Sequence, residues 1–268
     1  MPWKLTDLFP SPKPVIGMLH VPALPGSPRN GLTFAAILEH VLTDAEALAA
    51  GGVDGLIVEN YGDNPFYPNR VPPHTVAFLS VIAAEVKRRH SLPLGVNVLR
   101  NDSLAAMAAA SASGADFIRV NILTGARVTD QGIIEGEAHE LLRYRRQLAS
   151  GVRIFADVAV KHSSAVGNRS LLEEVEDALL RGGADAIIVT GSATGKSTPI
   201  ADLRQVKRAS GTAPIFAGSG TGLADAGEIL AIADGVIAGT SFKRGGLTTN
   251  PVDLNRVAAL MDLVRALR

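Results

Sequence analysis

The sequence predicts an α/β fold, a single closed (β/α)8 barrel of the TIM type, and two observations carry this prediction. A Gly-X-Asp turn, or an Ala-Asp-Gly variant of it, precedes an apolar strand four times, at 52–58, 114–120, 183–189 and 233–238. Four apolar segments of another kind, three of them entered through proline, alternate with these at 14–18, 93–97, 153–157 and 214–217. Eight alternating strands imply right-handed crossovers, a parallel sheet and closure. A doubly wound open sheet is the structural alternative.

The segments between the strands have the periodicity of amphipathic helices. Apolar residues from Phe34 to Leu48 recur at i, i+3, i+4, i+7 and onward, which places them on one stripe. The same spacing recurs within 76–86, 171–179 and 257–267. We expect one barrel domain over residues 1–268, with 1–13 as an N-terminal extension.

Composition favours a soluble, cytoplasmic globular protein. With 47% hydrophobic residues among 268, the chain can bury a large core. The 26 basic residues balance the 26 acidic ones, so no overall charge attracts nucleic acid or an anionic membrane. The absence of cysteine excludes disulfides, thiolate zinc sites and cysteine nucleophiles. No segment approaches the roughly 20 apolar residues of a spanning helix, and the composition leaves a homo-oligomer open.

A glycine-rich turn at 214–222 predicts a phosphate site. It follows the seventh strand, and glycines let backbone N–H groups approach an anion closely. The turns after strands seven and eight are where barrels of this kind usually hold phosphate. The predicted phosphate ligands in these two turns are Gly218, Ser219, Gly220, Gly239, Thr240 and Ser241.

Residues 190–197 nearly match a nucleotide-binding P-loop. Thr190 stands where that motif needs glycine, and an eight-stranded barrel is the wrong context for it. We therefore interpret the segment as the sixth turn of the barrel, where Gly191, Ser192 and Lys196 are still able to touch a phosphate. No nucleotide cofactor is indicated.

Polar residues at the ends of the predicted strands indicate the reacting centre. Because alternate residues of a strand face the barrel interior, these side chains should converge at its carboxyl end. We expect Glu59 or Asp157 as a base, His20 as an alternative acid or base, and Lys161 as a cation or Schiff-base amine. Asn97, Arg119 and Asn121 would bind the oxygenated end of a substrate. Ion pairing of Glu59 or Asp157 with Arg119 or Lys161 is the purely structural alternative.

A divalent metal held by His20, Glu59 and Asp157 is a weaker prediction, because no ligand pair recurs at a diagnostic spacing. Histidines within helical segments, such as His40, are expected to be ordinary surface or packing residues.

Several segments, taken together and in order, resemble the BtpA/SgcQ family. They are residues 17–20, 24–28, 58–66, 95–102, 118–121, 157–162 and 190–195, with the turns at 218 and 239. The resemblance covers about residues 14–267. It implies a ribulose-phosphate-binding-like barrel and a role in photosystem I biogenesis, and some relatives carry a nucleoside triphosphatase label.

These observations favour an enzyme that acts on a small phosphorylated metabolite, with phosphosugar-type lyase or isomerase chemistry. A non-enzymatic assembly factor for a membrane complex such as photosystem I is the alternative. A hydrolase of nucleoside triphosphates is a third hypothesis.

Overall fold

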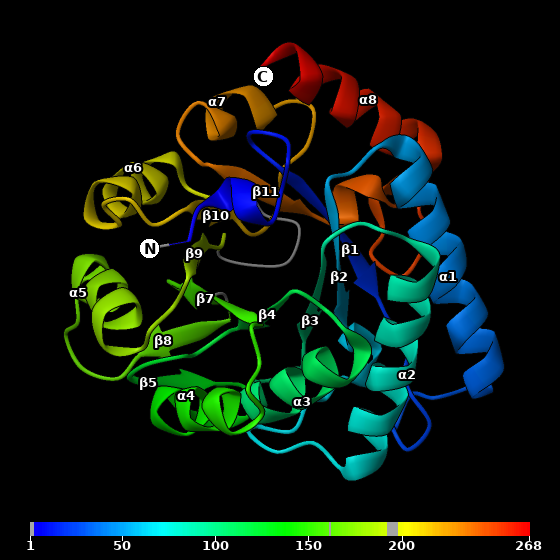
Figure 1. Ribbon diagram of the computed structural model, residues 1–268, viewed down its shortest axis with the longest axis horizontal. Coiled ribbons are helices and arrows are strands. Elements are labelled where there is room, and N and C mark those ends of the chain that lie inside the picture. The colour runs from blue at the N-terminus through cyan, green and yellow to red at the C-terminus, as the bar shows by residue number, and fades with distance from the viewer. Residues whose placement is uncertain (1–2, 161, 192–197) are drawn as a thin grey trace.

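The computed structural model describes residues 3–160, 162–191 and 198–268, and it confirms the closed parallel barrel (Figure 1). Eight strands close in the order β1-β11-β10-β9-β7-β4-β3-β2, so each barrel strand pairs with the next one along the chain. β1 and β11 complete the ring through parallel pairing. The barrel strands are β1 (Val15–His20), β2 (Gly55–Glu59), β3 (Leu94–Asn97), β4 (Phe117–Val120), β7 (Arg153–Val158), β9 (Ala186–Val189), β10 (Ile215–Ala217) and β11 (Gly235–Ala238).

The helices form a ring around the barrel, as Figure 1 shows. The predicted stripe in the first helix is confirmed, since Ile37, Val41 and Leu48 are buried against the sheet. Among the described residues, no helix is both long and apolar enough to cross a membrane. The helices are α1 (Phe34–Gly51), α2 (Pro73–Arg89), α3 (Ser103–Ser113), α4 (Ala138–Gln147), α5 (Leu171–Glu176), α6 (Ile200–Ala209), α7 (Ala226–Leu230) and α8 (Leu254–Ala266).

The repeated aspartates have a shared structural task at the amino ends of the strands. Each accepts a backbone N–H from the start of the preceding barrel strand and pairs with a basic side chain. A carboxylate in this position satisfies a strand donor that the ladder leaves open. The backbone contacts are Asp54 with Val15 (2.8 Å), Asp116 with Leu94 (2.8 Å), Asp185 with Ile154 (2.8 Å) and Asp234 with Ile215 (2.9 Å). The basic partners are Arg268, Lys87, Arg153 and Lys207.

Aromatic rings fill the lower part of the barrel interior. The rings of Phe117 and Phe155 stack with centroids 4.5 Å apart, and Phe216 stacks on Phe155 at 5.3 Å. Phe9, from the N-terminal extension, is fully buried and lies 6.2 Å from both Phe117 and Phe216. Trp3 stacks on Phe155 and donates its indole N–H to the Asp185 carbonyl at 3.0 Å. The extension therefore closes the amino end of the barrel.

A small second sheet lies in the loops that follow β4 and β7. Its three antiparallel strands are β5 (Ala126–Thr129), β6 (Gly132–Glu135) and β8 (Ser163–Ala165), in the order β6-β5-β8. Ile134 of β6 is buried in a cluster with Ile122 and Val160. This sheet was not predicted from the sequence.

Candidate active site

A cavity of about 840 Å³ opens at the carboxyl ends of the barrel strands. Its wall includes His20 at the end of β1, Glu59 at the end of β2, Arg119 in β4, and the turns that follow β10 and β11. The volume lies within the range of small-molecule sites, roughly 300–1,000 Å³. The inward parity predicted for these strands is confirmed, because Ile57, Phe117 and Phe155 lie below the cavity in the inner cluster of the barrel.

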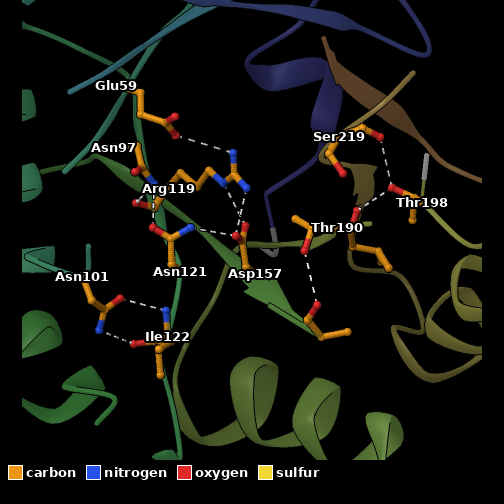
Figure 2. A network of polar contacts seen from close by, with 12 residues as sticks. Glu59, Asn97, Asn101, Arg119, Asn121, Ile122, Asp157, Thr190, Thr198 and Ser219 are labelled. Atoms are coloured by element: carbon orange, nitrogen blue, oxygen red, sulfur yellow. Dashed lines mark hydrogen bonds and ion pairs between the residues drawn. The ribbon is translucent and has the colours of Figure 1, made fainter. Parts of the chain in front are cut away.

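Arg119 is held between two carboxylates in the wall of this cavity (Figure 2). Its Nε and Nη2 donate to the two carboxylate oxygens of Asp157, both at 2.9 Å. Its Nη1 lies 3.9 Å from Glu59 Oε2. Burial by itself would lower the pKa of the Arg119 guanidinium, but Asp157 and Glu59 outweigh that effect and the pKa is raised. Arg119 is therefore a fixed, fully charged group.

Two amides complete the arrangement around Arg119. The Asn121 side chain donates to Asp157 Oδ2 at 2.8 Å. The Asn97 side chain donates to the Arg119 carbonyl at 3.0 Å and to Asn121 Oδ1 at 3.3 Å. The bonds from Arg119 and Asn121 use both oxygens of Asp157, so the contacts of Asp157 are those of a residue that orients Arg119 and Asn121.

Glu59 is placed differently from Asp157. Its side chain borders the cavity, is 7% exposed, and lies 3.9 Å from Arg119 Nη1. A carboxylate that faces a cavity and stays beside a cation is able to accept a proton from a bound molecule. Of the two predicted bases, Glu59 is the one that borders the cavity.

The turns after β10 and β11 form another part of the cavity wall. The Gly191 N–H donates to Ser219 Oγ at 2.7 Å, which ties the turn after β10 to the end of β9. Gly220 has φ of +70°, a conformation that favours glycine. At Gly239 a Cβ would lie 2.7 Å from His20 Cε1, so the His20 ring packs directly on this turn. Figure 2 shows Ser219 across the view from Glu59 and Asn97.

The structure brings most, but not all, of the predicted residues to the cavity. Those that border it are His20, Glu59, Arg119, Asn121, Gly218, Ser219, Gly220, Gly239 and Thr240. Asn97, Asp157 and Gly191 are buried behind the wall, where they support the residues in front. Ser241 follows the wall residue Thr240, and Lys161, Ser192 and Lys196 lie outside the described residues.

The cavity also has residues that sequence reasoning missed. His40, expected to be an ordinary helical histidine, borders the cavity from α1, and its Nε2 lies 3.6 Å from Asp44. Tyr61 borders it with its ring 4.9 Å from the His20 ring. Arg100 borders it from the loop after β3. The other missed wall residues include Arg29, Asp130, His162, Thr248 and Thr249. They lie in loops, where no periodicity marks which side chains face inward.

Within the part of the chain that the structure describes, no three His, Asp or Glu side chains are grouped as a metal site requires. Of the three weak candidates, Asp157 has both oxygens occupied by Arg119 and Asn121, whereas His20 and Glu59 border the cavity.

The fold and the site define a class, the parallel (β/α)8 barrels with a cavity at the carboxyl ends of the strands. The chain belongs to the BtpA family, whose model matches residues 11–266. It is 46% identical over 258 residues to the photosystem I biogenesis protein BtpA of Synechocystis sp., covering 96% of this chain and 90% of that protein. It is 46% identical over 258 residues to an uncharacterized protein of Pyrococcus horikoshii, covering 96% and 97%. It is 38% identical to an uncharacterized mitochondrial protein of Caenorhabditis elegans, covering 98% of each chain.

Solved structures of low sequence identity share the fold. KGPDC from Streptococcus mutans has a TM-score of 0.61 at 12% identity, covering 96% of this chain and 99% of that one. A native KDPGal structure has a TM-score of 0.60 at 15% identity, covering 99% and 98%. N-(5'-phosphoribosyl)anthranilate isomerase from Pyrococcus furiosus has a TM-score of 0.57 at 12% identity, covering 95% and 99%. The predicted family and barrel fold are thus both confirmed.

Proposed function

We propose that this chain is an enzyme that acts on a small phosphorylated metabolite by proton transfer or carbon–carbon bond cleavage. One observation carries the proposal: a single cavity is bordered both by the glycine turns after β10 and β11 and by Glu59 with Arg119 and Asn121. An anion-binding backbone and a carboxylate beside fixed donors are the two parts that phosphosugar lyases and isomerases need. The isomerase named among the structural neighbours has the same fold, which adds weak support.

The turns after β10 and β11 would bind the phosphate. Gly220 and Gly239 have no side chain to block the approach of an oxyanion to their backbone. The bond from Gly191 to Ser219 holds the first turn in place before ligand arrives, so little ordering accompanies binding. The Thr240 side chain lies beside these glycines in the cavity wall.

The other side of the cavity would carry out the chemistry. Glu59 would remove a proton from the carbon next to a substrate carbonyl, and the electron pair would move onto the carbonyl oxygen. Arg119 and Asn121, both in the cavity wall, would stabilise that developing oxyanion. His20, at the border between this centre and the Gly239 turn, would return a proton to the product. Cleavage of a carbon–carbon bond would use the same oxyanion stabilisation.

Two substitutions at Gly220 test the phosphate part of this proposal. Asp and Asn both tolerate the positive φ of this position, and they differ by a charge rather than by size. In calorimetric titrations with a panel of sugar phosphates, Gly220→Asp should weaken binding at least about tenfold relative to Gly220→Asn, because its carboxylate repels the phosphate. Equal affinities for the two variants, or no binding of any sugar phosphate by the unmodified protein, would contradict the proposal.

A proton-exchange assay tests the chemical part. Any sugar phosphate that binds is incubated with the protein in D2O, and the loss of the proton next to its carbonyl is followed by NMR. Glu59→Gln should slow this exchange by roughly 10²–10⁴-fold without a comparable loss of affinity. If Glu59→Gln exchanges the proton as fast as the unmodified protein does, Glu59 is not the base.

The same titrations separate the enzyme from the alternatives. Biogenesis of photosystem I is what the Synechocystis relative is named for, and a scaffold of that kind has no need of a sugar phosphate. For the nucleoside triphosphatase hypothesis, Lys196 lies outside the described residues, so an ATP and GTP turnover assay with Lys196→Ala is its direct test.

A further inference from the structure

Arg100 is a buried cation in the wall of the cavity to which the mechanism above gives no task. The whole residue is only 4% exposed, yet it borders the cavity. Its backbone N–H donates to the Tyr67 carbonyl at 3.1 Å, which fixes the start of its side chain. Burying a guanidinium is costly unless charges or hydrogen bonds compensate it. Burial lowers the pKa of Arg100, while Asp157, Asp130 and Glu59 act in the opposite direction.

Each of the three carboxylates near Arg100 also contacts another group or the solvent. Asp157 is bonded to Arg119 through both oxygens, and Glu59 faces the reacting centre. Asp130 is exposed, so solvent screens its charge. A guanidinium carries five N–H donors in a planar fork. Contacts within the protein are therefore compatible with a further, bidentate contact to a ligand oxyanion.

The barrel places Arg100 opposite the phosphate turns. Arg100 follows β3, and in the closed order of the barrel β3 is four strands from β10 in either direction. Strand spacing and tilt in an eight-stranded barrel give a backbone diameter of about 15 Å. Because the Arg100 side chain reaches inward, the distance from its guanidinium to the turns on the opposite wall is about the length of a sugar chain. Arg100 and Gly218–Gly220 border the same cavity, so one ligand is able to touch both.

We propose that the substrate carries a second anionic group, a carboxylate or a second phosphate, and that Arg100 binds it on the wall opposite the turns after β10 and β11. This inference rests on the proposed function, because it assumes that a phosphate occupies those turns. It narrows the substrate class to phosphorylated sugar acids and sugar bisphosphates. Glu59 and Arg119 would then act on the carbons between the two anchored ends.

Matched ligand pairs test this inference by calorimetric titration of the full chain. In each pair the second ligand carries an additional anion at carbon 1: glucose 6-phosphate with 6-phosphogluconate for the carboxylate, and fructose 6-phosphate with fructose 1,6-bisphosphate for the phosphate. In the unmodified protein the second anion should tighten binding roughly tenfold to a hundredfold in one pair, the gain expected of charged hydrogen bonds. Arg100→Gln should abolish that gain and leave the affinity for the monophosphate within about threefold. Gly220→Asp should weaken the binding of both ligands of the pair.

The outcomes distinguish the inference from the proposed function. If monophosphates bind and the second anion adds nothing in either pair, or if the gain survives in Arg100→Gln, the inference is wrong and the proposed function stands. If no member of any pair binds the unmodified protein, both fail. If Arg100→Gln does not fold, Arg100→Lys decides: it keeps the charge but not the fork, so the gain should shrink without reaching zero.

Discussion

Removing the charge of Asp157 tests whether the ion pair of Asp157 with Arg119 is shielded from solvent and fixed in place, as the structure indicates. The Asp157 side chain is 0% exposed and the Arg119 side chain 1% exposed. Asp157→Asn would break a bidentate ion pair with two 2.9 Å bonds and leave the guanidinium with Glu59, 3.9 Å away, as its remaining close carboxylate. Breaking a buried pair from one side destabilises a protein by about 3–5 kcal/mol. We expect a loss of that size in the free energy of unfolding.

The assay is urea unfolding of the unmodified protein and of three variants, Asp157→Asn among them. Glu85→Gln is the matched control, because it removes the same charge from an ion pair with Arg88 whose side chains are 32% and 65% exposed. That loss should be much smaller, because solvent screens an exposed ion pair. A double variant, Asp157→Leu with Arg119→Met, should recover part of the Asp157→Asn loss, since it removes both charges of the buried pair instead of one. If Asp157→Asn costs no more than Glu85→Gln, the pair is solvated and the reasoning about a fixed Arg119 is refuted.

Three further predictions concern other parts of the molecule. Phe9→Ala should lower the free energy of unfolding by about 3–5 kcal/mol but leave sugar phosphate affinity unchanged, because this buried ring closes the end of the barrel opposite the cavity; a change in affinity would contradict that placement. Lys243→Met leaves the Asp44 carboxylate buried without its lysine and should cost about 3 kcal/mol or more in urea unfolding, whereas Lys207→Met, at a partly exposed pair, should cost under about 1 kcal/mol. Burial raises the pKa of Asp63, so the Asp63 carboxyl stays protonated to higher pH in the folded state than in the unfolded chain. The contribution of Asp63 to the free energy of unfolding should therefore fall as the pH rises from about 3.9 through the raised pKa. The stability of the unmodified protein relative to Asp63→Asn, measured by urea unfolding at several pH values, should decrease across that interval, and an increase would contradict the sign.

The barrel and the inward faces of its strands were predictable because both follow from short-range patterns. Alternation fixes which residues of a strand share a face, so Glu59, Arg119 and Asp157 were placed inside once closure was assumed. The repeated aspartates marked strand starts for a physical reason that the structure supplies: each one binds the N–H at the beginning of the neighbouring strand.

The division of roles within the site was not predictable from the same patterns. Strand alternation places both Glu59 and Asp157 on inward faces and does not distinguish them. The contacts of the folded chain do: Asp157 is bonded to Arg119 and Asn121 behind the cavity wall, while Glu59 borders the cavity. Arg100 lies in a loop, where the backbone follows no period and orientation depends on contacts far away in the chain.

Two features of the fold were missed because they depend on long-range contacts. The N-terminal extension has no helical or strand periodicity, and Phe9 is buried only because Phe117 and Phe216 come together in the assembled barrel. Pairing of β5 with β8 joins loops that follow different barrel strands, so neither segment signals the other.

A crystal of this protein soaked in tungstate, a tetrahedral oxyanion that stands in for phosphate, tests the central claim most directly. The account predicts an anomalous peak within hydrogen-bond distance of the backbone N–H groups of Ser219 or Gly220 and of Gly239 or Thr240. A cavity whose turns stay empty at saturating tungstate, with anions found only at basic side chains on the outer surface, would contradict it.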